Sequence, residues 1–121
     1  MMVLVDTSIW IDHLRKSNAH LEQLLLDLEV ACHPFIIGEL ACGNLKNRSE
    51  ILTLLHALPL APTIEYDEIL HFIEHNKLMG MGFGLIDVHL LASARLAPLA
   101  LWTSDKRLFN AAKALHIAYT F

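Results

Sequence analysis

Short apolar runs and amphipathic segments alternate along this chain. The first run covers residues 2–5 and ends at Asp6, and two similar runs lie at residues 30–32 and 99–103. Runs of this length that are rich in Val, Leu and Ala are typical of buried strands whose two faces are both covered. They predict a small sheet in the centre of the fold.

Between these runs, apolar residues recur every three or four positions, which predicts amphipathic helices. Pro34 stands at the first position of one helix, where its missing N–H costs nothing, and Pro98 ends another. Prolines also interrupt the apolar stretch 58–62, which is therefore expected to form at most a short edge strand, while residues 117–119 are expected to form a last strand. The helices are expected at residues 7–15, 21–28, 34–45, 49–58, 64–78, 87–96 and 105–112.

Helices that alternate with short strands predict a single domain over residues 1–121. The expected fold class is α/β, a three-layer α/β/α arrangement around a mostly parallel sheet of four to five strands. A chain of this length can bury one substantial core. Carboxylates placed where strands end are of special interest, because open α/β sheets bind ligands at the carboxyl ends of their strands.

The composition suggests protein partners and no membrane. Hydrophobic residues make up 55% of the chain, yet no run approaches the roughly 20 residues of a membrane span. Asp6 comes too early for a secretory leader, so the chain is expected to be cytoplasmic. The surplus of apolar surface favours a homodimer, a second protein or both. Cys32 and Cys42 are expected to be buried, reduced thiols.

The charge leaves a nucleic-acid function open. Thirteen acids against nine Lys and Arg give a net charge of −4, which argues against a strongly basic coat for nucleic acid. If four acids were gathered in one metal site, however, the remaining nine would balance the nine bases.

Four acids stand in positions that could share one site. Asp6 and Asp105 follow predicted strands, and Asp87 opens a helix after the glycine-rich loop 80–84. Each of these three could be a helix N-cap. Glu39 differs, because it lies inside an apolar helix where burial of a carboxylate is costly unless a cation or hydrogen bonds compensate it. A solvated helix edge is the alternative for Glu39.

The ordered set of motifs around these acids resembles the PIN-domain nucleases, and in particular the VapC-type toxins of prokaryotic toxin–antitoxin pairs. The resemblance covers nearly the whole chain, and no single motif carries it alone. The motifs are Asp6-Thr7-Ser8-x-Trp10, Glu39-Leu40 with Gly43, Gly84-x-x-Asp87-x-x-Leu90, and Thr103-x-Asp105.

The resemblance implies that the four acids are catalytic and together bind Mg²⁺ or Mn²⁺, the hard ions that all-carboxylate ligation suits. Such an ion would relieve the repulsion between the carboxylates and activate water for attack on a phosphodiester. Ser8 and Thr103 resemble the family's hydroxyl positions and would steer water or phosphate, with capping and turn bonds as their alternative. Asp6 then ranks first as a metal ligand, and Thr7 and Ser8 cap the following helix. The implied metal ligands are Asp6, Glu39, Asp87 and Asp105.

The function that the resemblance implies is a metal-dependent endoribonuclease that cleaves structured RNA such as tRNA or rRNA and is bound by a cognate antitoxin. The alternative is an interaction module of the same fold with weak or lost catalysis, which acts through antitoxin binding or dimerisation. A helix-lined groove could hold the antitoxin, although most of its side chains could equally be core. Its residues would be Trp10, Ile11 and Leu14 beside Leu21, Leu24, Leu25 and Leu28.

Three other patterns are weaker. His71, Glu74 and His75 match the H-x-x-E-H motif of some zinc proteases, but no third ligand stands out, and a partly exposed helix face is expected instead. The loop 80–84 lacks the spacing of a dinucleotide fingerprint and is expected to be a flexible loop at the mouth of the site. Ser8 stands where a phosphotransferase with an aspartate nucleophile at Asp6 would commonly carry a second aspartate, which argues against that class.

Overall fold

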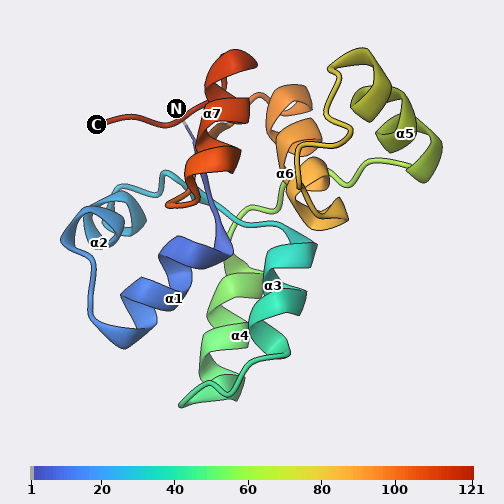
Figure 1. The fold of residues 1–121 in the computed structure, drawn as a ribbon. Coiled ribbons are helices and arrows are strands. Elements are labelled where there is room, and N and C mark those ends of the chain that lie inside the picture. Colours follow the sequence, from blue (N-terminus) through green and yellow to red (C-terminus); the bar gives the residue numbers. More distant parts are fainter. Residues whose placement is uncertain (1) are drawn as a thin grey trace.

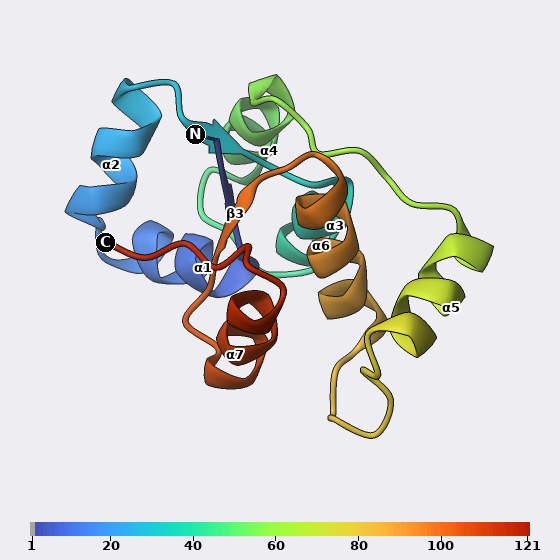
Figure 2. The ribbon, with the colours of Figure 1, turned by 90° about the horizontal axis from the view of Figure 1, so that it is seen from above.

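Three parallel strands form the centre of the computed structural model, which describes residues 2–121. β1 (Val3–Val5) lies between β2 (Val30–Ala31) and β3 (Ala100–Trp102), and Figure 2 shows β1 and β3 side by side among the helices. Val3 is paired with β2 on one side and with β3 on the other. Every strand residue is buried, as the short apolar runs predict.

The prediction of four to five strands is wrong, because the described sheet has three. Residues 58–62 and 117–119 do lie beside it, but each forms only a single parallel bridge, Leu60 with Cys32 and Ala118 with Leu101. Pro59 and Pro62 flank Leu60 and lack the N–H groups that a longer ladder would use. In β3, the described backbone partner of residues 117–119 is Leu101, which donates to Ile117 and accepts from Tyr119.

Seven helices are present in the described part of the chain, at or within a few residues of the predicted positions. α2 ends before Leu28, which has a left-handed φ of 58° and is 83% exposed. The bounds are α1 (Thr7–Arg15), α2 (Ala19–Leu26), α3 (Pro34–Ala41), α4 (Arg48–Ala57), α5 (Tyr66–His75), α6 (Leu85–Leu96) and α7 (Lys106–Ala114).

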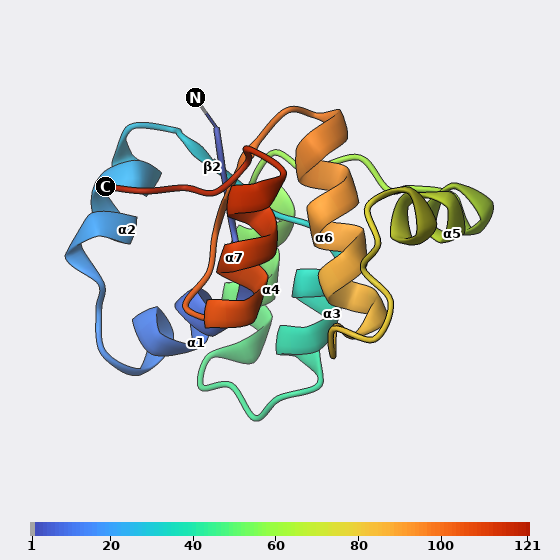
Figure 3. The same cartoon turned by 45° about the horizontal axis from the view of Figure 1, so that its top comes forward.

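The helices form two layers. α3 packs on α1 and α4, whereas α6 packs on α5 and α7, and Figure 1 shows the first set low in the molecule and the second set high. Figure 3 shows α5 at the outer edge beside α6. The chain moves one way across the sheet, from β1 to β2 and Leu60, and then returns to β3. Right-handed crossovers therefore place the two sets on opposite faces.

The reversal of direction makes the β1–β3 boundary the topological switch point of the sheet. Side chains that follow β1 and β3 meet there, which is where open α/β sheets bind ligands. Asp6 follows β1, and Thr103 and Asp105 follow β3.

The apolar surplus is mostly used in the core. Fully buried side chains come from strands and helices alike, including Leu4, Leu21, Ile36, Leu90 and Leu101. No helix within residues 2–121 has the length and apolar character needed to cross a membrane. Both cysteines are free thiols, but the prediction that both are buried holds only for Cys32, because Cys42 is exposed at the end of α3.

Candidate functional site

Asp6 lies at the carboxyl end of β1 and is only 7% exposed. Its backbone N–H donates to the carbonyl of Trp102 at 2.9 Å, which ties it to the end of β3. It occupies the N-cap position of α1, but its side chain accepts no bond from the helix backbone. The carboxylate is therefore not used for capping.

Two hydroxyl groups hold the Asp6 carboxylate in place. Ser8 Oγ donates to Oδ2 at 2.9 Å, and Thr103 Oγ1 donates to the same oxygen at 2.7 Å. The Ser8 hydroxyl in turn accepts from the N–H of Ser104, and the Thr103 hydroxyl accepts from the N–H of Asp105. The two hydroxyls thus connect the loop after β3 to Asp6 and direct both hydrogen bonds to one oxygen, which leaves Oδ1 for another ligand.

The prediction that Thr7 and Ser8 cap α1 is wrong. Both residues lie inside the first turn of the helix, and their hydroxyls bond to carboxylates instead of to the free N–H groups. Thr7 Oγ1 donates to Glu39 Oε1 at 2.7 Å. Sequence reasoning missed this role of Thr7, and the only signal for it was the pair of adjacent hydroxyl residues after Asp6.

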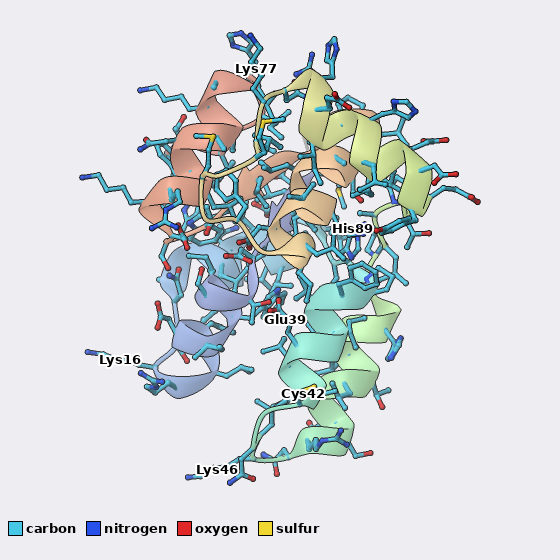
Figure 4. All side chains as sticks on the ribbon, turned by 45° about the vertical axis from the view of Figure 1, so that its right-hand side comes forward. Lys16, Glu39, Cys42, Lys46, Lys77 and His89 are labelled. Carbon is cyan, nitrogen blue, oxygen red and sulfur yellow. The ribbon has the colours of Figure 1, made fainter. Side chains whose placement is uncertain are left out.

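Glu39 lies on α3 at the exposed helix edge, where its carboxylate faces α1 (Figure 4). The hydrogen bond from Thr7, the residue that follows Asp6 in the chain, places Glu39 next to the first turn of α1. Exposure explains how an apolar helix can carry this carboxylate without a cation. Glu39 therefore lies on a solvent-exposed helix edge, as the alternative predicted, and also contacts α1.

Asp87 is the third residue of α6, so it does not open the helix, which begins at Leu85. Its Oδ2 accepts from the N–H of Gly84 at 3.3 Å. Burial raises the pKa of this half-buried carboxyl, the bond from Gly84 lowers it, and the negative charges of Asp6 and Asp105 raise it further. The electrostatic effect shows that Asp87 belongs to the same neighbourhood as the other two acids.

Asp105 is the N-cap of α7 and is exposed. Its Oδ1 accepts from the N–H of Leu108 at 3.0 Å, so this carboxylate has a capping role. Its other oxygen remains for a further ligand.

The structure joins Asp6, Ser8, Thr103 and Asp105 by hydrogen bonds and Asp87 by charge, whereas Glu39 is attached through Thr7. Among residues 2–121, no three His, Cys, Asp or Glu side chains are close enough together to hold a metal ion as they stand. The donor chemistry nevertheless fits Mg²⁺ or Mn²⁺, because the available groups are carboxylate and hydroxyl oxygens. Both charges that act on Asp87 are negative, so a cation would relieve them.

The H-x-x-E-H pattern does not form a metal centre in the described chain. His71, Glu74 and His75 are all exposed on α5, as expected for a helix face in solvent.

The apolar groove differs from its prediction. Trp10, Leu21 and Leu24 are buried core residues, and Leu28 points into solvent. A cavity of about 250 Å³ does lie beside α1, but its opposite wall is α4, which the sequence did not suggest. Its lining residues are Trp10, His13, Leu14, Leu25, Ile51, Leu54, Leu55 and Leu58.

Comparisons with known proteins agree with this fold. Residues 3–114 match the family model described as PIN domain. The chain is 48% identical over 108 residues to Ribonuclease VapC32 from two strains of Mycobacterium tuberculosis, an alignment that covers 88% of this chain and 87% of the relative.

Two solved structures share the fold at low sequence identity. PAE2754 from Pyrobaculum aerophilum superposes with a TM-score of 0.67 at 20% identity, covering 98% of this chain and 88% of that one. A chain of FitAB bound to an IR36 DNA fragment also gives 0.67, at 22% identity and with 97% and 92% covered.

Proposed function

This chain belongs to the PIN domain family, in its VapC-type branch, and on that premise we propose that it is a divalent-metal-dependent endoribonuclease and the toxin of a toxin–antitoxin pair. The observation that carries the proposal is the gathering of like charge at the switch point of the sheet. Burial raises the pKa of Asp87, and the negative charges of Asp6 and Asp105 raise it further, although separated acids on a surface would cost the fold less. The ribonuclease name of the relative supports RNA as the substrate.

Asp6, Asp87, Asp105 and Glu39 would hold Mg²⁺ or Mn²⁺. The bound ion would neutralise the carboxylates, stabilise charge on the phosphoryl oxygens and lower the pKa of a water molecule. The residues of the chain would do the positioning. Ser8 and Thr103 hold Oδ2 of Asp6, so that its other oxygen keeps a fixed direction, and Thr7 holds Glu39 in the same way.

Cleavage of RNA with and without Mn²⁺ tests the proposal. A total RNA preparation that contains tRNA and rRNA is the first substrate, and sequencing of the products identifies the cut site. We expect cleavage in Mn²⁺ or Mg²⁺, none in excess EDTA, and none by Asp6→Asn. Asp12→Asn is the matched control, since Asp12 is an exposed acid on the same helix outside the site.

Two results would contradict the nuclease assignment. Full activity in excess EDTA would remove the metal from the mechanism. Absence of cleavage in either metal by a chain that still binds its partner would favour the interaction module.

The cavity between α1 and α4 is the surface that we propose for the antitoxin. It is apolar, and the exposed side chains at its rim, such as Leu14 and Leu54, would gain burial when an apolar peptide segment binds. The VapC-type relationship supports a partner of this kind.

Co-purification with the product of a small gene immediately upstream tests the partner. Leu54→Asp should abolish the complex, because it places a charge in the cavity. Leu96→Asp is the control, because Leu96 is equally exposed (63% against 62%) but lies on α6. Equal retention of the partner by both variants would exclude this surface.

We also propose that the chain is cytoplasmic, where its RNA substrates are, and that it forms a homodimer. Exposed apolar residues on α5, in the loop after it and at the first position of α6, among them Leu70, Met79 and Leu85, support self-association. Sedimentation equilibrium should give twice the mass of one chain, and a single-chain mass at micromolar concentration would contradict the dimer.

A further inference from the structure

Arg107 connects α7 to the glycine-rich loop. Its Nη1 donates to the carbonyl oxygen of Gly82 at 3.3 Å. The side chain is exposed and lies two residues after the candidate ligand Asp105. Together with Asp105, Lys106 and Asn110 it lines an open hollow at the start of α7. A cation therefore borders the acidic site on the α7 side.

The contact with Gly82 uses little of what the guanidinium can offer. An arginine side chain has five N–H donors in a planar fork, and the structure assigns one of them, at a long distance, to a neutral carbonyl. A phosphate would accept two charge-assisted hydrogen bonds from the same fork, which are roughly twice as strong as bonds between neutral groups. A phosphate is therefore a stronger hydrogen-bond acceptor for this guanidinium than the Gly82 carbonyl.

The charge around the site also favours a cation at this place. Asp6, Glu39, Asp87 and Asp105 are four carboxylates, and one divalent ion carries only two positive charges, so the phosphates on either side of a bound scissile phosphate would still meet net negative charge. A metal ion at the centre of the site would not reach those flanking phosphates. Lys106 and Arg107 are the cations that share a hollow with Asp105, and of the two, Arg107 is held in position by the Gly82 carbonyl.

Gly82 is shaped for this contact. Its φ is +82°, and a Cβ at this position would overlap Nη1 of Arg107. Gly80 also has a positive φ, +72°, but a Cβ there would meet nothing within 4 Å. Both glycines thus supply the same backbone conformation, and only Gly82 leaves room for the guanidinium. This difference gives a matched pair of variants.

We propose that Arg107 binds a backbone phosphate of the RNA next to the scissile one, and that its bond to Gly82 in the free chain is the contact that this phosphate replaces. The inference rests on the proposed function, since it takes RNA as the ligand. It adds a substrate-binding residue outside the acidic set and makes loop 80–84 the element that Arg107 releases when RNA binds.

The first test is RNA binding without cleavage. Fluorescence anisotropy of a labelled stem–loop RNA is measured in EDTA at low salt with the wild-type chain, Arg107→Ala and Lys113→Ala. Lys113 lies in the last turn of α7, away from the hollow. We expect Arg107→Ala to bind about tenfold more weakly, with the slope of log K against log salt reduced by about 1, and Lys113→Ala to change little. Equal affinity of wild type and Arg107→Ala, or no binding by wild type, would overturn the proposal.

The second test separates phosphate binding from a purely structural contact. Gly82→Ala displaces the guanidinium from the loop but leaves it in the chain, and Gly80→Ala imposes the same backbone strain without touching Arg107. If Arg107 binds phosphate, Gly82→Ala keeps or improves the RNA affinity of Gly80→Ala. If the contact is only structural, Arg107→Ala and Gly82→Ala lower kcat alike and leave RNA affinity unchanged, and the proposal fails.

These tests fail independently of the nuclease assignment. Metal-dependent cleavage together with Arg107-independent RNA binding would leave the proposed function standing and remove this inference. Arg107-dependent RNA binding without cleavage in any metal would remove the nuclease assignment and leave Arg107 as an RNA-binding residue.

Discussion

Asp6 and His33 occupy equivalent places in the fold but use their side chains in opposite ways. Each follows a strand of the parallel sheet, each is the N-cap of the next helix, and each is buried. His33 Nδ1 accepts from the N–H of Phe35 at 3.0 Å, which caps α3. Because Nδ1 accepts, Nε2 carries the proton and donates to Ser93 Oγ at 3.1 Å.

The environment of His33 keeps it neutral. Burial lowers the pKa of its imidazole to about 4, and the neighbouring His89 lowers it in the same direction. Both ring nitrogens have partners. His33 is therefore a satisfied structural group whose whole hydrogen-bonding capacity stabilises the fold.

The Asp6 carboxylate contributes nothing to its helix cap and is held by Ser8 and Thr103 instead. Its charge adds to the unfavourable environment of Asp87. A capping residue that does not cap, beside like charges, indicates a site kept for a ligand at some cost to stability. Asp6 and His33 are both N-cap residues after a strand, and only their side-chain partners distinguish the candidate ligand from the structural cap.

The largest expected difference is between Asp87→Asn and the wild type. Asparagine keeps an oxygen that can accept from Gly84, but it removes the charge that burial, Asp6 and Asp105 all disfavour. We expect metal-dependent cleavage to fall by at least about 100-fold, the scale on which loss of a catalytic group acts, and the midpoint of thermal unfolding at pH 7 to stay or rise. A lower midpoint of thermal unfolding with retained cleavage would show that the Asp87 carboxylate stabilises the fold and is not needed for catalysis.

His33→Ala should give the opposite pattern. It removes the cap of α3, the bond to Ser93 and a fully buried ring. We expect the free energy of unfolding to fall by about 2–4 kcal/mol, as for other large-to-small core substitutions. Cleavage by the folded fraction at low temperature should change less than about twofold. Urea denaturation and initial rates measure the two quantities, and a selective loss of cleavage would place His33 in the site.

The stability of the wild-type chain should depend on pH through His33. Its folded pKa of about 4 lies below the ordinary value of 6.5, so the unfolded state binds more protons between these values. The contribution of His33 to the free energy of unfolding is therefore fully present above pH 6.5 and is lost as the pH falls towards 4, by at most about 3 kcal/mol. Asp87 acts in the other direction, because its raised pKa makes the folded state bind more protons.

Urea denaturation at a series of pH values checks this dependence. His33→Ala should flatten the loss between pH 6.5 and 4, whereas Asp87→Asn should make it steeper. Parallel curves for wild type and His33→Ala would show that another group controls the dependence.

Asp105 combines the two roles, and two substitutions can separate them. Asparagine can still cap α7 by accepting from Leu108, whereas alanine cannot. We expect Asp105→Ala to be about 1 kcal/mol less stable than Asp105→Asn, while both lose cleavage to the same extent. Equal stability of the two variants would show that the cap of α7 is unimportant. Higher cleavage activity of Asp105→Asn than of Asp105→Ala would show that the negative charge of Asp105 is not needed for cleavage.

The sequence predicted the features that depend on local pattern. The buried strands follow from apolar runs, and the helices from their spacing and from Pro34 and Pro98, so their bounds are close to those observed. The order of the acids also carried the family relationship. These features need no knowledge of which residues meet across the fold.

The features that the sequence did not predict depend on distant contacts. Residues 58–62 and 117–119 each form a single bridge instead of a strand. In residues 58–62, Pro59 and Pro62 lack the N–H groups that a longer ladder needs. The hydroxyls of Thr7 and Ser8 bond to carboxylates because the fold places Glu39 and Asp6 within their reach. Thr103 reaches Asp6 across 97 residues of chain, and Arg107 reaches Gly82 across 25.

Direct binding of Mn²⁺ tests the central claim, that Asp6 is kept from its capping role in order to bind a divalent cation. Isothermal titration at pH 7 compares the wild type with Asp6→Asn and with the control Asp12→Asn. The account predicts saturable binding by the wild type and by Asp12→Asn, and at least about tenfold weaker binding by Asp6→Asn. Equal affinity of all three proteins for Mn²⁺, or no binding by the wild type, would contradict it.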